Sequence, residues 1–293
     1  MKKKITEKVL ILGAYGYLGS ILSSYLNKKY KVLKVGRKKN SEIIIKKIKE
    51  IKNIIIKNKP SIIINLIACA DIEKCEQMKY TAINLNIKVL NIIAQAVKKI
   101  RINNCHLIHI STDQVYSGIG NHNEKYAKPV NFYGKTKLLG EKEILKINAT
   151  ILRTNFIGRN THTNKKTLSD WIVNCIKNKV KINCYTNIFF SPLHTSTLCK
   201  YIEVVMKKKI NGIYNLGSIN KISKAEYALK LLKLLKLLKF NKKLISMTKY
   251  STSNVNRPLD MSLNTSKFQK IYKIKLPNVN NEIYKNSLDY IKK

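Results

Sequence analysis

Residues 8–19 read KVLILGAYGYLG, and this stretch sets the expected fold of the chain. Its first five residues form an apolar run that suits a short buried strand, and Gly13, Gly16 and Gly19 follow at once. From Leu18 to Leu26, apolar residues recur at spacings of three and four, which is the period of a helix. A strand, a glycine turn and a helix in this order let the backbone approach a pyrophosphate that rests on the helix N-terminus. The stretch therefore predicts a dinucleotide-binding unit.

Segments with strand and helix patterns alternate after this stretch. The strands are expected at residues 31–35, 61–68, 106–110, 150–154 and 212–216. The helices are expected at residues 41–58, 77–100, 133–146 and 195–208. Such alternation predicts an α/β fold, a doubly wound parallel sheet of the Rossmann-like type with a smaller C-terminal substrate-binding lobe.

The same pattern suggests how the chain divides. Residues 1–157 form the predicted NAD(P)-binding Rossmann domain, and the segment near residues 192–218 is expected to return to it. Residues 158–293 are expected to belong mainly to the substrate-binding lobe. Ligands of such sheets bind beyond the C-terminal ends of the strands.

Tyr133 and Lys137 are four residues apart, so they lie on one face of the expected helix, about one turn from each other. A free tyrosine has a pKa of about 10, and a neighbouring ammonium favours the phenolate and lowers that pKa. Thr112 ends a strand and offers a hydroxyl to the oxygen that would receive the proton. The pair alone is a weak signal because the chain has 16 Tyr and many lysines. With the glycine turn and the strand ends, it becomes the strongest proton-delivery site in the sequence.

The end of the second expected strand bears on the cofactor. It reads Gly36-Arg37-Lys38-Lys39 and has no acidic residue to hold the ribose hydroxyl of NAD. Arg37 and Lys38 would instead suit the 2′-phosphate of NADP. We expect NADP(H) to be preferred, and NAD(H) stays open because lysine is frequent throughout the chain.

The chain carries a formal net charge of +41, from 57 Lys and Arg against 16 Asp and Glu. These charges are spread along the chain, and no Arg-rich cluster or zinc pattern accompanies them. The distribution favours compositional drift over a specific nucleic-acid partner, and the positive field would help to attract an anionic nucleotide. Whether the charge is functional stays open.

Residues 229–240 repeat Leu-Leu-Lys and would form a helix with a broad leucine face. A helix packed on the substrate lobe is favoured over one that binds a partner or a membrane surface. No run of about 18 apolar residues is present, so no transmembrane helix is expected.

The cysteines and histidines bear on metals and on the compartment. The six cysteines include no Cys-x-x-Cys pair, and the five histidines show no ligand spacing, so we expect reduced thiols and no metal site. His106 and His109 are expected to pack within their strand. No signal-peptide pattern opens the sequence, and we expect a cytoplasmic protein.

Several motifs together resemble the extended short-chain dehydrogenase/reductase superfamily, and within it the dTDP-4-dehydrorhamnose reductase-like family. The resemblance covers most of the chain. The motifs are KPSIIINLIA (59–68), IEKCE (72–76), AIN (82–84), STDQVYSG (111–118), YGKTKLLGE (133–141), ILRT (151–154) and RPLD (257–260).

The resemblance implies roles for individual residues. Tyr133 would donate the proton to the C4 ketone, Lys137 would bind the nicotinamide ribose, and Thr112 would hydrogen-bond the substrate oxygen. The cofactor contacts would be Gly13, Gly16, Tyr17, Leu18, Gly19, Ile67, Ala68 and Cys69, together with Arg37, Tyr133 and Lys137. The substrate contacts would be Thr112, Asp113, Phe156 and Arg257.

The implied activity is the NAD(P)H-dependent reduction of the 4-keto group of a nucleotide-linked deoxysugar, for the dTDP-rhamnose and surface-polysaccharide pathways. The alternatives are a sugar-nucleotide epimerase of the same superfamily and a non-catalytic NADP-binding regulatory subunit. Dehydratases of the superfamily carry a Glu where this chain has Gln114, and an amide does not shuttle a proton at neutral pH. Cys69 and Ala70 depart from the family pattern and, with the missing acidic residues of the second strand region, leave the cofactor preference and the sugar open. The sequence does not say which nucleotide is used. A homodimer is left open as well.

Overall fold

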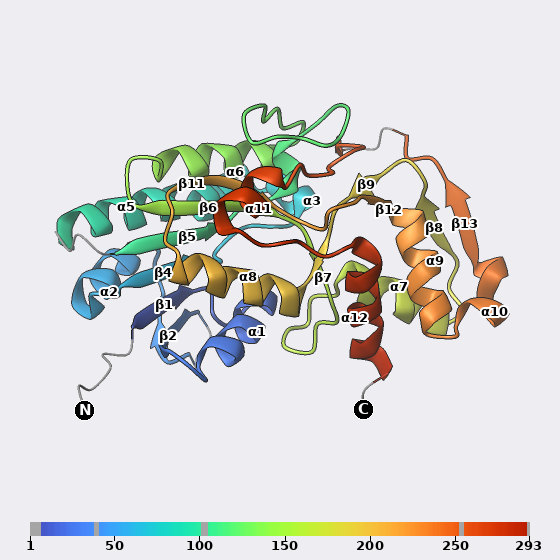
Figure 1. Cartoon of the computed structure of the whole chain (residues 1–293), viewed down its shortest axis with the longest axis horizontal. Coiled ribbons are helices and arrows are strands. Elements are labelled where there is room, and N and C mark those ends of the chain that lie inside the picture. The colour runs from blue at the N-terminus through green and yellow to red at the C-terminus, as the bar shows by residue number, and fades with distance from the viewer. Residues whose placement is uncertain (1–6, 38–40, 101–104, 252–254, 292–293) are drawn as a thin grey trace. The chain divides into compact units, whose positions relative to one another are not determined.

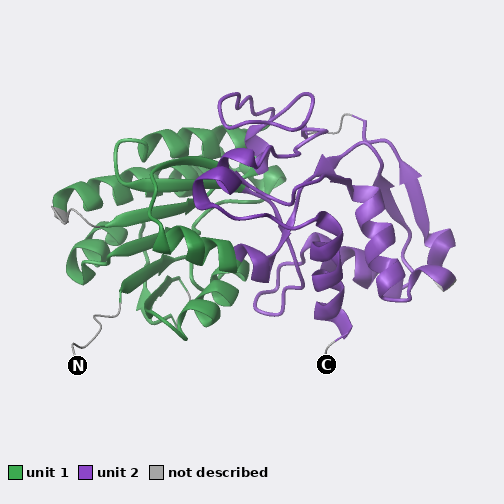
Figure 2. Ribbon diagram, in the orientation of Figure 1, with its two compact units in different colours: residues 1–112, 131–153, 199–214 green, residues 113–130, 154–198, 215–293 purple. Residues whose placement is uncertain are grey.

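Figure 1 shows the computed structural model of the chain, which describes residues 7–37, 41–100, 105–251 and 255–291. The chain folds as two units (Figure 2). The first unit holds residues 1–112, 131–153 and 199–214, and the second holds residues 113–130, 154–198 and 215–293. Residues 113–130 thus group with the second unit, and residues 199–214 group with the first.

The first unit is built on a seven-stranded sheet in the order β11-β6-β5-β4-β1-β2-β3. Its strands are β1 (Lys8–Leu12), β2 (Lys31–Gly36), β3 (Ile43–Ile44), β4 (Ile62–Asn65), β5 (His106–Ile110), β6 (Ala149–Thr154) and β11 (Gly212–Leu216). All ladders from β3 to β6 are parallel. The chain winds outward from β1 to β3 and then from β4 to β11, so the doubly wound fold is confirmed, with its switch point between β1 and β4.

Helices cover both faces of this sheet (Figure 1). The strands β4 and β5 are therefore buried at every residue, as expected for a parallel sheet. On one face, α2 (Glu50–Asn58) and α5 (Val89–Ile100) share a core with alternate residues of β1, β4 and β5. On the other face lie α1 (Tyr17–Leu26) and α8 (Thr195–Lys207), joined by the Tyr25 hydroxyl, which donates to Glu203 over 2.6 Å.

Two expected helices are wrong in part. Residues 41–58 do not form one helix, because β3 pairs with the end of β2 and α2 begins only at Glu50. The Leu-Leu-Lys repeat forms two helices, α9 (Lys224–Leu234) and α10 (Leu238–Asn241), separated by Lys236 at φ 58°. Leucines from both helices pack against the same core.

The second unit combines short strand pairs with helices. The pairs are β7 (Phe156–Ile157) with β10 (Leu193–His194), β8 (Ile182–Tyr185) with β13 (Ile245–Thr248), and β9 (Phe189–Phe190) with β12 (Ile222–Ser223). Its helices besides α9 and α10 are α7 (Leu168–Lys177), α11 (Ser266–Tyr272) and α12 (Val279–Ile291). Ser223 and Glu226 form a capping box that begins α9, a local signal that the sequence carries by itself. In the part of the chain that the structure describes, no helix has the length and apolarity needed to span a membrane.

Candidate active site

The ends of three neighbouring strands place the predicted residues of the first unit at one edge of the sheet. The register sets Leu12 of β1 beside Asn65 of β4, and Asn65 beside His109 of β5. The glycine turn, residues 66–69 and residues 111–112 each follow one of these strands, so they emerge together. This edge is where ligands of doubly wound sheets bind.

The glycine turn is built for close backbone packing. Gly13 has φ 85°, a region that strains any residue with a Cβ, and a Cβ there would lie 3.1 Å from the Leu66 carbonyl carbon. A Cβ on Gly19 would lie 2.2 Å from the Gly13 oxygen. α1 begins directly after Gly16, and no side chain caps its N-terminus. The turn therefore presents uncovered backbone at a helix N-terminus, which fits a pyrophosphate.

The end of the 66–69 segment is held in place by Asn86, which binds Cys69. This fully buried side chain lies in a π-helical turn (Asn84–Lys88) between α4 (Lys79–Ile83) and α5. Its amide accepts from the Cys69 N–H at 2.9 Å and donates to the Cys69 oxygen at 3.1 Å. It also donates to the Thr136 hydroxyl at 2.9 Å, which ties the segment to the next helix. The sequence analysis missed Asn86, although a polar residue inside an apolar helical run was a usable signal.

The helix α6 (Phe132–Glu143) carries Tyr133 and Lys137. The Asn131 side chain begins it by accepting from the Gly134 N–H at 2.8 Å. Tyr133 is 9% exposed and packs beside Cys69, whereas Lys137 is 2% exposed. Tyr133, Lys137 and the buried Thr112 all belong to the first unit.

Lys137 is fixed by two partners from β5. Its Nζ donates to the Ile110 carbonyl oxygen at 2.8 Å and lies 3.1 Å from His109 Nε2. Burial lowers the pKa of Lys137 to about 8, and Glu141 opposes this shift in part. Burial also lowers the pKa of His109 well below its ordinary value, and Lys137 adds to this effect. His109 is thus a packed strand residue, as expected, but it also contacts the predicted catalytic lysine.

A buried ion pair supports α6 from behind. Arg153 of β6 donates to Glu141 through Nη2 at 2.6 Å and through Nε at 3.1 Å. Ser111, just before Thr112, donates its hydroxyl to the same carboxylate. Arg153 is 2% exposed and Glu141 is 1% exposed. This network connects the helix of Tyr133 with two strands, and it explains the Arg and the Glu of the family motifs as structural residues.

The predicted substrate residues Asp113, Phe156 and Arg257 lie in the second unit. Asp113 is buried, and its Oδ2 accepts from the Asn155 amide at 2.8 Å. Phe156 begins β7, and Arg257 precedes the Asp260 carboxylate, which binds Lys221 at 2.6 Å.

Lys224 is a charged residue of the second unit that the sequence analysis missed. It is the first residue of α9 and is half-buried, with its Nζ 3.3 Å from the centre of the Phe190 ring. Burial lowers the pKa of Lys224 to about 8, while Asp113 raises it and Arg257 lowers it. Lys224 therefore lies near two predicted substrate residues. No sequence signal separates it from the other lysines.

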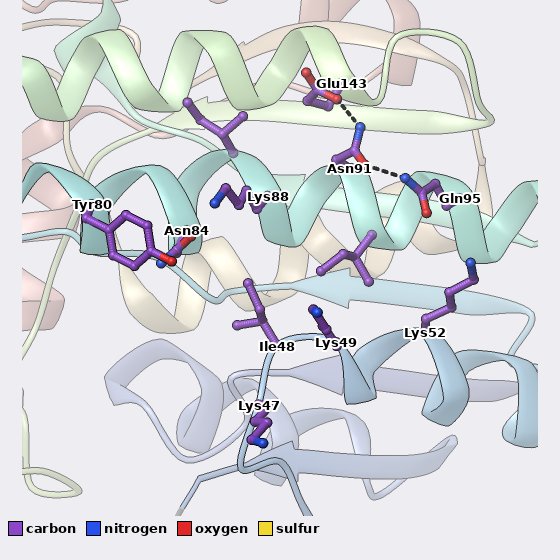
Figure 3. A pocket seen from close by; sticks show the side chains of 12 residues that line it. Lys47, Ile48, Lys49, Lys52, Tyr80, Asn84, Lys88, Asn91, Gln95 and Glu143 are labelled. Atoms are coloured by element: carbon purple, nitrogen blue, oxygen red, sulfur yellow. Dashed lines mark hydrogen bonds between the residues drawn. The ribbon is translucent and has the colours of Figure 1, made fainter.

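Arg37 follows β2 and is exposed, whereas Lys38 lies outside the described residues. A pocket of about 850 Å³ on the first unit is lined by Lys47, Lys49, Lys52 and Lys88 among others, and by none of the predicted site residues (Figure 3). Within the described ranges, no group of three or more His, Cys, Asp or Glu side chains is arranged to hold a metal ion.

Comparisons with known proteins show a family and several related chains. A family model described as the RmlD substrate binding domain matches residues 7–290. The dTDP-4-dehydrorhamnose reductase of Escherichia coli is 25% identical over 238 residues, which cover 75% of this chain and 77% of that protein.

Two solved structures have a similar fold. A hypothetical dTDP-4-dehydrorhamnose reductase from Sulfolobus tokodaii is 30% identical with a TM-score of 0.77, over 90% of this chain and 94% of the other. A dTDP-4-dehydrorhamnose reductase from Bacillus anthracis, in complex with NADP, is 20% identical with a TM-score of 0.82, over 98% and 100% of the two chains. The second likeness concerns the fold alone.

Proposed function

The chain belongs to the RmlD substrate binding domain family, and we propose that it reduces the 4-keto group of a nucleotide-linked deoxysugar with NADPH. One observation carries the proposal: Lys137 is buried and anchored by two β5 groups one helical turn after Tyr133, at the strand edge where Thr112 lies. A buried lysine without a functional role would be an unexplained cost to the fold. The relatives from Escherichia coli and Sulfolobus tokodaii, which are named as dTDP-4-dehydrorhamnose reductases, support the same activity.

The residues divide the chemistry among themselves. Bound NADPH supplies the hydride. Tyr133 gives its phenolic proton to the oxygen of the reduced carbonyl, and the Lys137 ammonium stabilises the phenolate that remains. Thr112 donates a hydrogen bond to the same substrate oxygen and orients it.

The groups that would hold the cofactor fit a dinucleotide. The Gly13–Gly19 turn accommodates the pyrophosphate because its backbone approach leaves no room for side chains. The neighbouring strand end holds Ile67, Ala68 and Cys69, and Asn86 fixes the backbone of Cys69. The exposed Arg37 supports a preference for NADP(H) over NAD(H). NAD(H) is the alternative cofactor.

The second unit supplies groups for the substrate. Asp113 and Phe156 contact the sugar, and the cations Arg257 and Lys224 hold the negative charge of the nucleotide. Lys224 is added to the set because its ammonium is near both Asp113 and Arg257.

A cytoplasmic location and a homodimer belong to the same proposal. All six cysteines are free thiols and five are buried, which supports a reducing compartment. Sedimentation of the purified protein tests the dimer, since a single species of 33.7 kDa would contradict it.

The experiment is an assay of the purified chain with NADPH and dTDP-4-keto-6-deoxyglucose, followed by the loss of NADPH absorbance. We expect turnover, and Tyr133→Phe should abolish it while NADPH affinity is nearly kept. Tyr126→Phe is the matched control, because Tyr126 is 74% exposed and belongs to none of the motifs. Interconversion of sugars without net oxidation would indicate an epimerase. Tight NADPH binding without any turnover would indicate a regulatory subunit.

A further inference from the structure

Asn65, His109 and Lys137 form a continuous line of buried side chains under the strand edge. Asn65 Nδ2 lies 3.1 Å from His109 Nδ1, and His109 Nε2 lies 3.1 Å from Lys137 Nζ. Their exposed fractions are 0%, 1% and 2%, so water does not reach the line. Every proton in it must therefore be shared among these three groups and their backbone neighbours.

The orientation of the Asn65 amide decides which ring nitrogen of His109 carries the proton. The Ile67 N–H donates to Asn65 Oδ1 at 3.3 Å, so the amide NH₂ group faces His109. His109 Nδ1 must then accept a hydrogen bond. Because a neutral imidazole carries a single N–H, that proton lies on Nε2 and points at Lys137.

We propose that His109 is a positioning residue that donates its Nε2–H to Lys137 Nζ and so favours loss of the lysine proton. The Nζ lone pair accepts this hydrogen bond only when the amine is neutral. The ammonium has no lone pair, so it cannot accept this hydrogen bond, and the two donor groups face each other. Lys137 therefore holds its proton less tightly than it would without His109, while its pKa of about 8 keeps it an ammonium at neutral pH.

The other groups around Lys137 agree with this assignment. From β5, the Ile110 carbonyl accepts from Nζ and suits either form of the lysine. From α6, Tyr133 shares the helix face, and the Glu141 carboxylate raises the pKa of Lys137. Glu141 is already bound by Arg153 and Ser111, which limits that opposing effect. His109 itself stays neutral, because burial holds its pKa well below the ordinary value.

The experiment measures the protonation of Lys137 directly in the full-length protein without cofactor. The side-chain ¹³Cε signal of labelled lysine reports the titration, and a Lys137→Met spectrum assigns it. His109→Leu removes the donor, so we expect the pKa of Lys137 to rise by about one unit, a tenfold change. His109→Gln keeps a donor and should restore most of the shift. A fall or no change in folded His109→Leu overturns the proposal, since a histidine that accepted from the ammonium would give the opposite sign.

Two further variants separate the role of His109 from general effects of substitution on folding. His106→Leu is the matched control, because His106 is buried on β5 but binds the Thr150 hydroxyl at 2.7 Å, and we expect no change at Lys137. Asn65→Asp should also raise the pKa of Lys137, since a carboxylate accepts a hydrogen bond from Nδ1–H and so favours the tautomer in which Nε2 is an acceptor. An unchanged lysine in Asn65→Asp overturns the tautomer assignment, even where His109→Leu fails to fold.

The inference concerns the lysine that the proposed function makes catalytic. Its test needs no turnover, so the two can fail separately. If the pKa of Lys137 does not change in His109→Leu while the wild type is an active reductase, only the role of His109 is rejected. If the pKa of Lys137 rises in His109→Leu but the protein oxidises no NADPH, the reductase function is rejected and the role of His109 is kept.

Discussion

Among the described residues, each unit of the molecule holds one lysine whose pKa is lowered to about 8 by burial, and the two lysines are held differently. Lys137 has its Nζ between a backbone oxygen and an imidazole. Lys224 has its Nζ against the face of Phe190, and no hydrogen bond of that Nζ is found within the described ranges. Lys137 is thus fixed before any ligand arrives, whereas the ammonium of Lys224 keeps its donors for one. The lowered pKa alone does not distinguish these two cases, but the hydrogen-bond partners do.

Removing the fixed lysine should have the largest effect on catalysis. Lys137→Met is expected to lower kcat by about a thousandfold, because the tyrosine loses the charge that stabilises its phenolate. Steady-state kinetics with NADPH check this. Lys135→Met is the control, since Lys135 is exposed on the same helix and should leave kcat unchanged. The same kcat for both variants would show that Lys137 has no role in the mechanism.

The pH dependence of stability should separate the two lysines next. The pKa of Lys137 is about 8 in the folded chain against 10.5 for the free group, so between these values the unfolded chain holds a proton that the folded chain has lost. Folding stability relative to Lys137→Met therefore rises with pH across this window, by up to about 3 kcal/mol at 1.36 kcal/mol per unit. Urea unfolding at pH 7.5 and pH 10.5 measures the difference. The rise should be smaller for Lys224, which is half-buried. A flat difference for Lys137 would show that its ammonium is not desolvated.

Removing the second lysine should change substrate binding rather than chemistry. Lys224→Met is expected to raise KM for the nucleotide sugar about tenfold, the value of one charge-assisted contact, with kcat nearly kept. Binding of NADPH should be unchanged. Lys233→Met, on the exposed face of the same helix, serves as the control. A lower kcat at constant KM would contradict this prediction, because it would show that Lys224, like Lys137, acts in the chemical step.

The smallest effect concerns the ring under Lys224. Phe190→Leu removes the aromatic face, whose attraction for a cation is worth about 0.5–1 kcal/mol, so KM should change about threefold. The neighbouring Phe189→Leu, whose ring faces Lys221, should leave KM unchanged. Thermal unfolding is needed alongside, because Phe190 is fully buried and its loss also costs stability. A KM equal to that of the wild type in a folded Phe190→Leu would show that the ring does not orient Lys224.

The sequence predicted the first unit better than the second. Its strands alternate with helices at regular intervals, and confirmed elements such as β1, β5 and β11 differ from expectation by at most a residue or two. The errors fall where Ile, Leu and Lys repeat without capping residues. Isoleucines at 43–44 join the sheet edge, and the leucine repeat turns at Lys236, because core packing overrides a periodic but uncapped pattern.

What the sequence determined by itself is local: the glycine turn, the strand ends and the Tyr133–Lys137 spacing on one helix face, all set by short-range periodicity. The tertiary structure decided which distant groups meet. His109 is 28 residues from Lys137, and Asn86 is 50 residues from Thr136, so no spacing rule connects them. Burial at the aligned ends of the strands then removes water from these groups, and this desolvation lowers the pKa of the lysine.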